Sequence, residues 1–425
     1  MKLRPLTKSL HFFALALSLL AISAQAQQPA AQPPRTKIRT ITAFVRVERG
    51  QYQIQFSEAL KFLKVAQTTF ESRGFTVQTL RIATQPFPEY TQGLSQAETL
   101  QFFKNLDAIT QDGHFVLSIG PACLSGNDCD AQADLLAEIL KNSKSIYGSL
   151  YVTNNQGVNW PAVKAAARVV KKLSDGTVHS EGNFHFAALA NVPQGSPFFP
   201  AAYLTGLGHQ FAVGLESANE VAAAFRDAPD VPTARRRLTD TFFQLATDVE
   251  DVALRVDRER GWIYLGLDLS PAPSKNASIG AAIEGLSKQP LGSAGTMTSV
   301  AAITSAIKDI GLRKTGYNGL MLPVLEDPTI ADRWNAGLVS IDSLMSYSAV
   351  CGTGLDTIPL PGDVTVDQLA RIIGDLATLS AKWNKPLSAR LLPVSGKLAG
   401  QTTEFTDPAL LNAIVQPLSG PETPH

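Results

Sequence analysis

The sequence predicts an α/β protein built around a largely parallel sheet. About ten short segments rich in apolar and β-branched residues alternate with longer segments whose apolar residues recur at helical spacing. Strands separated by helices indicate parallel pairing, because parallel neighbours need a crossover connection that usually holds a helix. Hydrophobic residues form 44% of the chain and charged residues 17%, which fits a globular chain with a large core.

Each expected element follows from its local pattern. The expected strands are residues 38–47, 75–82, 115–119, 146–152, 184–191, 210–215, 262–269, 319–324, 355–360 and 387–392. The clearest helical patterns cover residues 159–173 and 233–258, and we interpret the many charges of the second as a solvated face. Two more helices are expected after Ser95 and Thr365, since each is followed three residues later by Glu or Gln, as in a capping box.

The N-terminus is typical of an export signal. Lys2, Arg4 and Lys8 precede an apolar segment of eleven residues, 12–22, and Ala24-Gln25-Ala26 forms a small-residue cleavage site. The apolar segment is shorter than the roughly 20 residues that a membrane-spanning helix needs. We therefore expect cleavage near Ala26 and a secreted or periplasmic protein. An uncleaved anchor helix is the alternative.

The rest of the chain shows no break between domains. We expect a signal peptide over residues 1–26, a flexible leader over residues 27–35 that is rich in Pro, Gln and Ala, and a disordered tail over residues 419–425. Between them, residues 36–418 are predicted to form a single α/β domain, because no linker or charged tract interrupts the alternation of strands and helices.

The charge balance gives no reason to expect a polyanionic partner. The chain has 37 basic and 37 acidic residues, and loss of the signal would remove three basic residues and leave a net charge near −3. We therefore expect neither nucleic acid nor an anionic membrane surface as a partner. No second apolar segment is long enough to span a membrane. The expected partner is a small-molecule ligand, and the sequence also allows a homo-oligomer.

The three cysteines fall into a pair and a single residue. Cys123 and Cys129 flank a short turn-rich loop, and an exported protein matures where disulfides form, so we expect them to be bonded. Cys351 is then left over as either a buried thiol or a reactive one. Zinc binding by these residues is less favoured, because the few histidines lack the spacing of zinc ligands.

Polar residues and glycines follow several of the expected strands. In parallel α/β folds, ligands bind beyond the carboxyl ends of the strands, so these residues are candidates for a pocket. They are Asn191, Asp268, Ser270, Gly292, Thr296, Glu326 and Asp363. Each also has a structural interpretation: Ser270 suits a helix cap, and the turn from Gly292 to Thr296 suits either a cap or an anion at a helix N-terminus.

Cys351 lies where a helical pattern gives way to a glycine-rich turn. The segment from Ser346 to Asp363 reads Ser-Tyr-Ser-Ala-Val-Cys-Gly-Thr-Gly, followed by a short apolar run closed by Pro-Gly-Asp. Glycines allow positive φ angles and close approach of a ligand, so a thiol on this turn is well placed for chemistry. The competing interpretation is a small buried residue, because free cysteines are among the most buried side chains.

Several of these motifs together resemble a known family. The matching segments are residues 37–42, 191–201, 266–273, 316–324 with Glu326 and Asp327, the segment around Cys351, and 384–393. In this order and combination they are similar to the domain of unknown function 711 family, also called uncharacterised protein family 0210. The resemblance implies the fold of pyruvate formate-lyase and its relatives, a ten-stranded α/β barrel of two parallel five-stranded half-sheets.

The resemblance also bears on the site and on its chemistry. In that fold a cysteine loop threads the centre of the barrel, and Cys351 is the equivalent by motif. The chain has no arginine-valine-x-glycine-tyrosine segment near its C-terminus, the hallmark of a glycyl radical. Export also argues against a glycyl radical, which oxygen destroys. The resemblance therefore implies a barrel-centre site without implying radical lyase activity.

The first functional hypothesis is an exported enzyme acting on a small anionic metabolite, a non-radical lyase or hydrolase. Cys351 would be the nucleophile or an acid/base, and Asp268, Glu326 and Asp363 would be acid/base or metal-binding groups. Arg390 would pair with a substrate carboxylate through its planar fork. The remaining substrate-binding candidates are Asn191, Ser270, Gly292, Thr296 and Asn318.

Two rival hypotheses use the same pocket. One is a non-catalytic periplasmic protein that binds a small molecule without changing it. The other is a metal-dependent hydrolase or lyase, in which an oxygen-rich site would favour Mg²⁺, Ca²⁺ or Mn²⁺ over Zn²⁺. The sequence names no cofactor and no metal ligands.

Overall fold

The computed structural model describes Met1 and residues 36–124 and 128–418. From Thr36 onward, the described residues belong to one compact unit. The expected signal peptide, the leader over residues 27–35 and the tail over residues 419–425 lie outside the described residues, so those predictions stay predictions. Within the described residues, no helix is both long and apolar enough to cross a lipid bilayer.

The main sheet has ten strands, which confirms the α/β class. They are β1 (Lys37–Val45), β2 (Thr76–Val77), β3 (Leu80–Thr84), β4 (Val116–Ala122), β5 (Ile146–Tyr151), β8 (Phe186–Ala190), β9 (Gln210–Glu216), β10 (Ile263–Asp268), β11 (Gly354–Pro361) and β12 (Leu387–Val394). A separate hairpin pairs β6 (Thr153–Asn154) with β7 (Gly157–Val158). Every strand expected from the sequence overlaps one of these, except residues 319–324.

The sheet is mixed, with one central parallel group. Its order is β10-β9-β1-β3-β4-β5-β8-β12-β11, with β2 added beside β1. The five strands from β1 to β8 in this order are parallel to their neighbours. β9 and β10 form a parallel pair that is antiparallel to β1, and β11 and β12 form a parallel pair that is antiparallel to β8.

The two ends of the sheet are linked by an irregular segment, residues 313–324. The amide of Leu267 on β10 donates to Arg313 O at 3.0 Å, and the amide of Val324 donates to Asp356 O on β11 at 3.1 Å. The strand expected over residues 319–324 does not form, and Pro323, which has no amide donor, lies within it. The sheet is therefore not closed into a continuous ten-stranded barrel.

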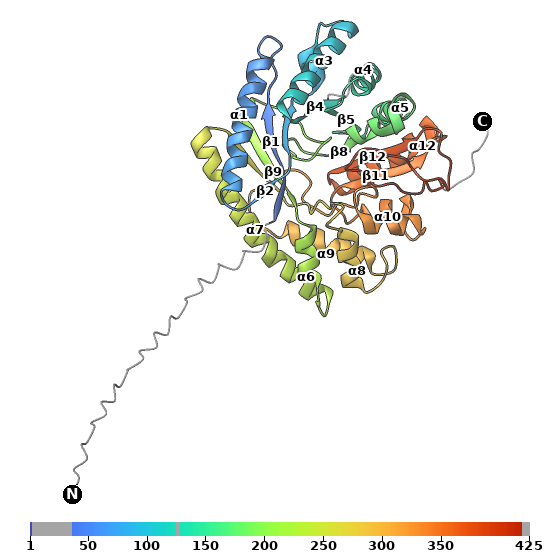
Figure 1. The fold of residues 1–425 in the computed structure, drawn as a ribbon. Coiled ribbons are helices and arrows are strands. Elements are labelled where there is room, and N and C mark those ends of the chain that lie inside the picture. The colour runs from blue at the N-terminus through green and yellow to red at the C-terminus, as the bar shows by residue number, and fades with distance from the viewer. Residues whose placement is uncertain (2–35, 125–127, 419–425) are drawn as a thin grey trace. The chain divides into compact units, whose positions relative to one another are not determined.

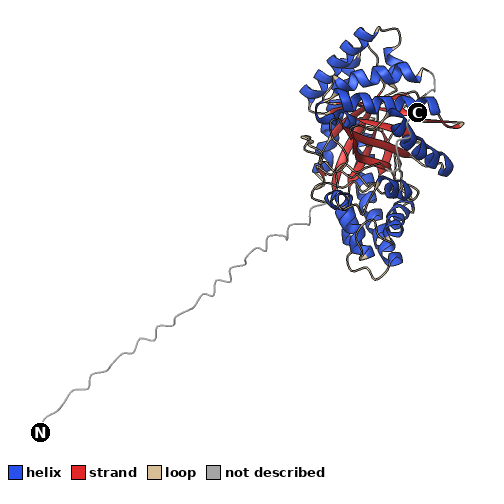
Figure 2. Cartoon of the chain, turned by 90° about the vertical axis from the view of Figure 1, so that its right-hand side faces the viewer, coloured by secondary structure: helices blue, strands red, loops and turns tan. Residues whose placement is uncertain are grey.

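Helices surround the strands, as Figures 1 and 2 show. They are α1 (Tyr52–Glu71), α2 (Phe87–Thr91), α3 (Gln96–Gly113), α4 (Cys129–Lys141), α5 (Trp160–Gly176), the 3-10 helix Val178–His185, α6 (Ala218–Phe225), α7 (Val231–Arg260), α8 (Ile279–Ser287), α9 (Thr296–Lys308), α10 (Pro328–Asn335), α11 (Ile341–Tyr347) and α12 (Val366–Trp383). The capping boxes at Ser95 and Thr365 open α3 and α12 as predicted.

The strands separate an apolar face from a more polar one. Successive residues of a strand point to opposite faces of the sheet. Ile82 on β3 and Ile146 on β5 belong to the main apolar core. Their chain neighbours Arg81 and Tyr147 point away from that core and line a pocket. We call this second face of the sheet the inner face.

A disulfide joins Cys123 and Cys129. Their Cα atoms are 4.9 Å apart, within the usual range of about 4.4–6.8 Å. The bond links the residue that follows β4 to the first residue of α4. Among the described residues, Cys351 is the cysteine that remains free.

Two glycines fasten the irregular segment to the turn before β11. The amide of Gly352 donates to Leu320 O at 2.7 Å. A Cβ atom on Gly352 would lie only 2.2 Å from the carbonyl carbon of Gly319, so the two backbones touch where neither residue has a side chain. Glycine is therefore required at Gly352 for close approach.

Gly352→Ala is expected to lower the free energy of unfolding by about 1–3 kcal/mol or more, because the backbone has to move to admit the methyl group. Gly285→Ala in α8 is the matched control: a Cβ there meets nothing within 4 Å, and we expect a gain of about 0.5–1 kcal/mol. Urea unfolding of both variants checks this. Equal stability of Gly352→Ala and the unchanged protein would contradict the close contact.

Candidate functional site

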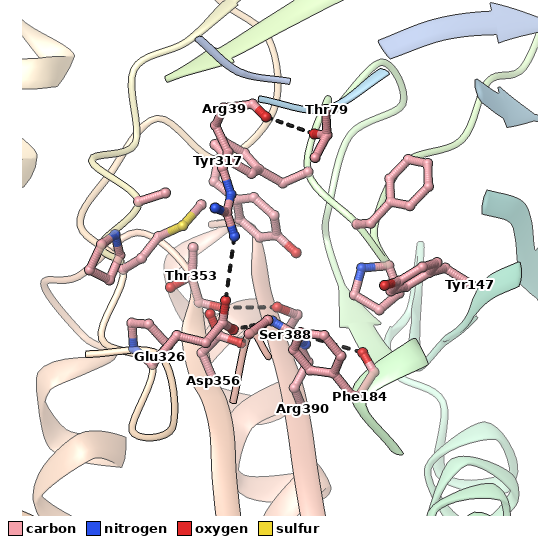
Figure 3. A pocket seen from close by; sticks show the side chains of 18 of the residues that line it. Arg39, Thr79, Tyr147, Phe184, Tyr317, Glu326, Thr353, Asp356, Ser388 and Arg390 are labelled. Atoms are coloured by element: carbon pink, nitrogen blue, oxygen red, sulfur yellow. Dashed lines mark hydrogen bonds and ion pairs between the residues drawn. The ribbon is translucent and has the colours of Figure 1, made fainter. Parts of the chain in front are cut away.

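A pocket opens on the inner face, with a cavity volume of ≈ 220 Å³. Figure 3 shows it from close by. Its lining comes from several strands and from loops between them, and we call it the inner pocket. It is lined by Arg39, Thr79, Arg81, Val116, Tyr147, Phe184, Phe198, Phe199, Pro200, Ala272, Pro273, Tyr317, Met321, Pro323, Glu326, Thr353, Asp356, Ser388, Arg390 and Ala409.

The inner pocket lies near the amino ends of the central parallel strands. Arg81 is the second residue of β3, Val116 the first of β4 and Tyr147 the second of β5. This differs from the expectation that ligands gather beyond the carboxyl ends. The reason is the mixed sheet: β11 and β12 run the other way and bring their own polar residues to the same place.

A buried ion-pair cluster forms one wall of the inner pocket. Nη1 of Arg390 donates to Glu326 Oε1 at 3.0 Å and to Asp356 Oδ1 at 2.9 Å. Nη2 of Arg390 donates to the carbonyl of Phe184 at 3.2 Å, and the guanidinium stacks 4.7 Å from the centre of the Phe184 ring. The side chains of Arg390, Glu326 and Asp356 are only 10%, 13% and 11% exposed. Figure 3 shows both carboxylates directed at Arg390.

The surroundings of Asp356 favour its protonated form. Burial raises the pKa of Asp356, and although Arg390 opposes this, the neighbouring Glu326 adds to it. Two carboxylates that share one guanidinium nitrogen repel each other, which favours a proton on one of them. The arrangement is typical of acid/base pairs, in which one carboxyl holds a proton while the other is ionised.

Arg39 lies above this cluster, and its contacts with carboxylates are longer than those of Arg390. Its guanidinium lies 3.8 Å from Glu326 Oε2 and 3.6 Å from Glu216 Oε2, beyond hydrogen-bond distance in both cases. Its side chain is 25% exposed. In Figure 3 the guanidinium of Arg39 points down toward Glu326. Its Nη1 also donates to Gln78 Oε1 at 3.2 Å, so Arg39 has one hydrogen bond and two longer ionic contacts.

Arg81 is the arginine of the inner pocket that has no carboxylate partner among the described residues. Its Nε donates to Thr79 Oγ1 at 3.2 Å, and its guanidinium lies 5.0 Å from the centre of the Phe199 ring. Burial, together with the nearby positive charge of Arg39, lowers the pKa of Arg81 to about 9. A guanidinium whose charge is disfavoured in this way attracts an anion.

Aromatic side chains complete the inner pocket. Burial raises the pKa of both Tyr147 and Tyr317, so each phenol stays protonated near neutral pH. The ring of His185 packs 4.3 Å from that of Tyr147. Burial and the positive charge of Arg390 lower the pKa of His185 to about 4, so its imidazole is neutral near pH 7.

Two of the sequence-predicted residues, Glu326 and Arg390, line the inner pocket. Their arrangement differs from the expectation, because Arg390 is paired with two carboxylates of the protein itself and is not the open partner for a substrate. Arg81 is better placed for that task.

Three predicted residues form a hydrogen-bonded hub behind Tyr317. Asp268 is fully buried and accepts hydrogen bonds from the hydroxyl of Ser270 at 2.6 Å and from the amides of Tyr317 and Asn318 at 2.7 and 3.0 Å. Burial raises the pKa of Asp268, while these hydrogen bonds lower it. None of Asp268, Ser270 and Asn318 lines the inner pocket. Their evident task is to hold the backbone that carries Tyr317.

Four other predicted residues lie elsewhere. Asn191 bonds Thr153 and Ser380, and the Gly292 amide donates to the hydroxyl of Thr296 at 3.0 Å at the start of α9. Asp363 is exposed after β11. None of the four lines the inner pocket.

Cys351 is fully buried in the main apolar core and does not line the inner pocket. Its thiol accepts the amide hydrogen of Gly354 at 3.4 Å. Its carbonyl accepts a 2.6 Å hydrogen bond from the ammonium of Lys385, which also bonds the carbonyls of Ser348 and Ala349. The geometry therefore favours the buried interpretation of Cys351 over the reactive one.

Sequence reasoning missed Arg39, Arg81, Tyr147 and Asp356. All four lie inside strands, whereas most of the predicted site residues lie at the ends of expected strands or beyond them. A signal was present: charged residues such as Arg81 and Arg390 interrupt otherwise apolar strands, and a buried charge needs a partner.

The described residues contain no group of three or more His, Cys, Asp or Glu side chains arranged to hold a metal ion. We therefore assign no metal ligands.

Comparison with known proteins places the chain in a family. Residues 32–408 match the family model described as Uncharacterised ACR (DUF711). A UPF0210 protein from Pyrobaculum islandicum is 32% identical over 366 residues, covering 81% of this chain and 80% of that protein. A UPF0210 protein from Methanosarcina barkeri is 27% identical over 365 residues, with 81% and 80% covered. The chain belongs to the DUF711 family.

Among solved structures, the chain is similar to an anaerobic ribonucleotide reductase from Thermotoga maritima with citrate in the active site. The TM-score is 0.41 and the sequence identity 8%, with 83% of this chain and 80% of that chain covered. The same reductase in complex with dATP and CTP gives a TM-score of 0.38. Similarity at this level carries no argument about the activity of this chain.

Arg390→Met is expected to lower the free energy of unfolding by about 3–5 kcal/mol at neutral pH, because it leaves two buried carboxylates without their cation. The loss should shrink toward pH 5. The raised pKa of Asp356 rises further without Arg390, so the folded variant binds protons that the unfolded chain does not, and its stability increases as the pH falls.

Urea unfolding at several pH values measures this. The matched control is Arg235→Met, which removes an exposed pair with Asp309 and should cost at most about 1 kcal/mol at any pH. If Arg390→Met loses the same free energy of unfolding at every pH, the argument from the raised pKa of Asp356 is contradicted.

Cys351 is expected to resist alkylation in the folded protein, because its side chain has no exposed surface. Iodoacetamide treatment followed by mass spectrometry should find Cys351 unmodified without denaturant and modified in urea. Rapid modification of Cys351 in the native protein would show that it is a reactive thiol.

Proposed function

We propose that the protein is an exported enzyme that binds a small anionic metabolite in the inner pocket and acts on it by proton transfer. The observation that carries the proposal is the position of Arg81. It is a guanidinium without a carboxylate partner among the described residues, in the same pocket as the paired carboxylates Glu326 and Asp356. An anion-binding group beside an acid/base pair is typical of enzymes that act on small acids.

Binding follows from the charges of the inner pocket. Arg81 supplies the fixed positive charge, and its planar fork suits the two oxygens of a carboxylate. Arg39 lies 3.6 and 3.8 Å from Glu216 and Glu326, and it adds a second positive charge beside the bound anion. A bound anion would offset the unfavourable burial of Arg81.

The proposed chemistry uses the carboxyl pair. Asp356, whose pKa is raised by burial, holds a proton and acts as general acid, while Glu326 acts as general base. Arg390 keeps both groups in place and limits their mutual repulsion. Such a pair suits a non-radical lyase or a hydrolase, and it needs no thiol. This moves the proposed site from Cys351 to the ion-pair cluster.

Export and barrel closure are parts of the same proposal. The N-terminal pattern of Lys2, Arg4, the apolar segment 12–22 and the cleavage site at Ala26 supports secretion or a periplasmic location. Contacts of residues 313–324 with both β10 and β11 support a barrel that closes through this segment, similar to the pyruvate-formate-lyase-like fold.

A second candidate is a non-catalytic periplasmic protein that binds the same anion. The observation that favours it is the burial of Cys351 away from the inner pocket, which removes the nucleophile that the sequence offered. The two candidates share the anion site and differ only in whether the ligand is changed.

Arg81→Met is expected to abolish stabilisation by small carboxylates while raising the melting temperature of the free protein, because it removes a partly buried charge that lacks a carboxylate partner among the described residues. A ligand at about 100 times its Kd adds about 2.7 kcal/mol, which a thermal-shift screen detects. Arg235→Met on α7 is the control and should bind like the unchanged protein. Equal shifts in Arg81→Met, or no shift with any carboxylate in the unchanged protein, would contradict the proposal.

Asp356→Asn separates the two candidates. For an enzyme, this variant should still bind the carboxylate found by the screen but lose at least about 100-fold in turnover, which is the usual contribution of a general acid. NMR spectra of the ligand before and after incubation report the turnover. If the protein without substitutions does not change the ligand, the second candidate, a non-catalytic binding protein, is the function that the result supports.

A further inference from the structure

We infer that the metabolite is a hydrophobic monocarboxylate, a molecule with one negative charge and a compact apolar body such as a single aromatic ring. This inference rests on the proposed function, since it specifies the anion that Arg81 would bind. It is carried by the balance of charges in the inner pocket, by the character of the remaining wall and by the size of the cavity.

One arginine of the inner pocket has no carboxylate partner among the described residues, so the pocket can compensate one added negative charge. Its lining contains three arginines, Arg39, Arg81 and Arg390, and two carboxylates, Glu326 and Asp356. Both carboxylates are in contact with Arg390, and Glu326 also faces Arg39. In the proposed function Asp356 holds a proton, so Glu326 offsets Arg390, and Glu216 offsets Arg39, whose guanidinium lies 3.6 Å from it. Arg81 is then the arginine that a bound monoanion would balance. A second negative charge would have to draw Arg39 away from Glu216 and Glu326, which takes a cation from two carboxylates of the protein and costs free energy.

The same balance separates a carboxylate from a phosphate ester. A guanidinium fork binds either group. A phosphate monoester carries a charge of about −1.5 to −2 at pH 7, more than the single uncompensated positive charge of the inner pocket. A carboxylate carries one charge and matches it.

Most of the remaining wall is apolar or aromatic, and the hydroxyls of Thr79, Thr353 and Ser388 in it donate to backbone carbonyls of the protein. Phe198, Ala272 and Met321 pack with Tyr317 in one cluster on the inner face. The remaining apolar lining residues are Val116, Phe184, Phe199, Pro200, Pro273, Pro323 and Ala409. Proline, alanine, phenylalanine and methionine side chains offer no hydrogen bonds to a ligand. A sugar acid or polyhydroxy acid would therefore place several of its hydroxyl groups against these apolar side chains, whereas a ring or branched alkyl chain would gain contact.

The charged group and the apolar wall adjoin each other. The guanidinium of Arg81 lies over the ring of Phe199, 5.0 Å from its centre. A carboxylate that bonds Arg81 would thus direct its organic body along the aromatic side chains. The cavity of ≈ 220 Å³ is smaller than the roughly 300–1,000 Å³ typical of sites for drug-sized ligands, which limits the body to about one ring.

Isothermal titration of the purified protein with four probes tests the inference. Phenylacetate carries the inferred features, phenylacetamide lacks the charge, succinate lacks the apolar body, and phenyl phosphate carries the larger charge. We expect phenylacetate to bind at least ten-fold more tightly than each of the other three. Arg81→Met should lose phenylacetate binding, and Arg81→Gln repeats the test if the first variant does not fold. Arg235 is exposed and does not line the inner pocket, so Arg235→Met should bind all four probes as the unchanged protein does.

The outcomes separate this inference from the proposed function. If succinate or phenyl phosphate binds as tightly as phenylacetate and needs Arg81, the anion site stands and the inferred ligand class is wrong. If phenylacetamide binds as well as phenylacetate, the carboxylate is not recognised and the inference falls. If no anion shows binding that depends on Arg81, both the inference and the proposed function are overturned.

Discussion

The ion-pair cluster around Arg390 is the interaction on which the inner pocket depends. Arg390 on β12 reaches Asp356 on β11, Glu326 in the loop after residues 313–324, and the carbonyl of Phe184 before β8, which are 34, 64 and 206 positions away in the chain. Replacing a buried ion pair with apolar groups is often neutral for stability, whereas removing one partner is costly. We interpret the cluster as a device that fixes three segments and keeps two carboxylates side by side.

Neighbouring carboxylates in this protein have different tasks because their partners differ. Asp327 is buried and accepts hydrogen bonds from the amides of Ile279 and Ile330, so it joins the N-termini of α8 and α10. Glu326, one residue earlier, turns to the inner pocket. Asp268 likewise has its oxygens occupied by donors of the hub behind Tyr317. A carboxylate surrounded by amide donors supports structure, while one that shares a cation with another carboxylate is available for proton transfer.

The fold could be predicted further from the sequence than the site. Strand and helix positions follow from local periodicity, and the capping boxes at Ser95 and Thr365 mark helix starts directly. The antiparallel pairing of β9 with β1 and of β12 with β8 depends on long-range contacts that local patterns do not contain. Long-range contacts also explain why the strand expected over residues 319–324 does not form, because the backbone of this segment makes hydrogen bonds with distant segments.

For the site, residue type predicted Glu326 and Arg390 but not their partners. A charged residue inside an apolar strand indicates that a buried partner exists, yet only the folded chain shows that Arg390 has two and that Arg81 has none among the described residues. The glycine-rich turn at Cys351 is explained by packing: Gly352 permits contact with Gly319, and the thiol lies in the core. A glycine that lets two backbone segments touch cannot be distinguished in a sequence from a glycine that lets a ligand approach the backbone.

The most direct test of the central claim is a crystal structure of the protein soaked with 4-bromophenylacetate, with the bromine located by its anomalous signal. The claim is that Arg81 is an open anion site in a pocket organised by Arg390. The expected result is a carboxylate within hydrogen-bond distance of the Arg81 guanidinium and a bromine among the aromatic side chains, with Arg390 still bonded to Glu326 and Asp356. An Arg81 paired with a carboxylate of the protein itself, or a ligand bound only outside the inner pocket, would contradict the account.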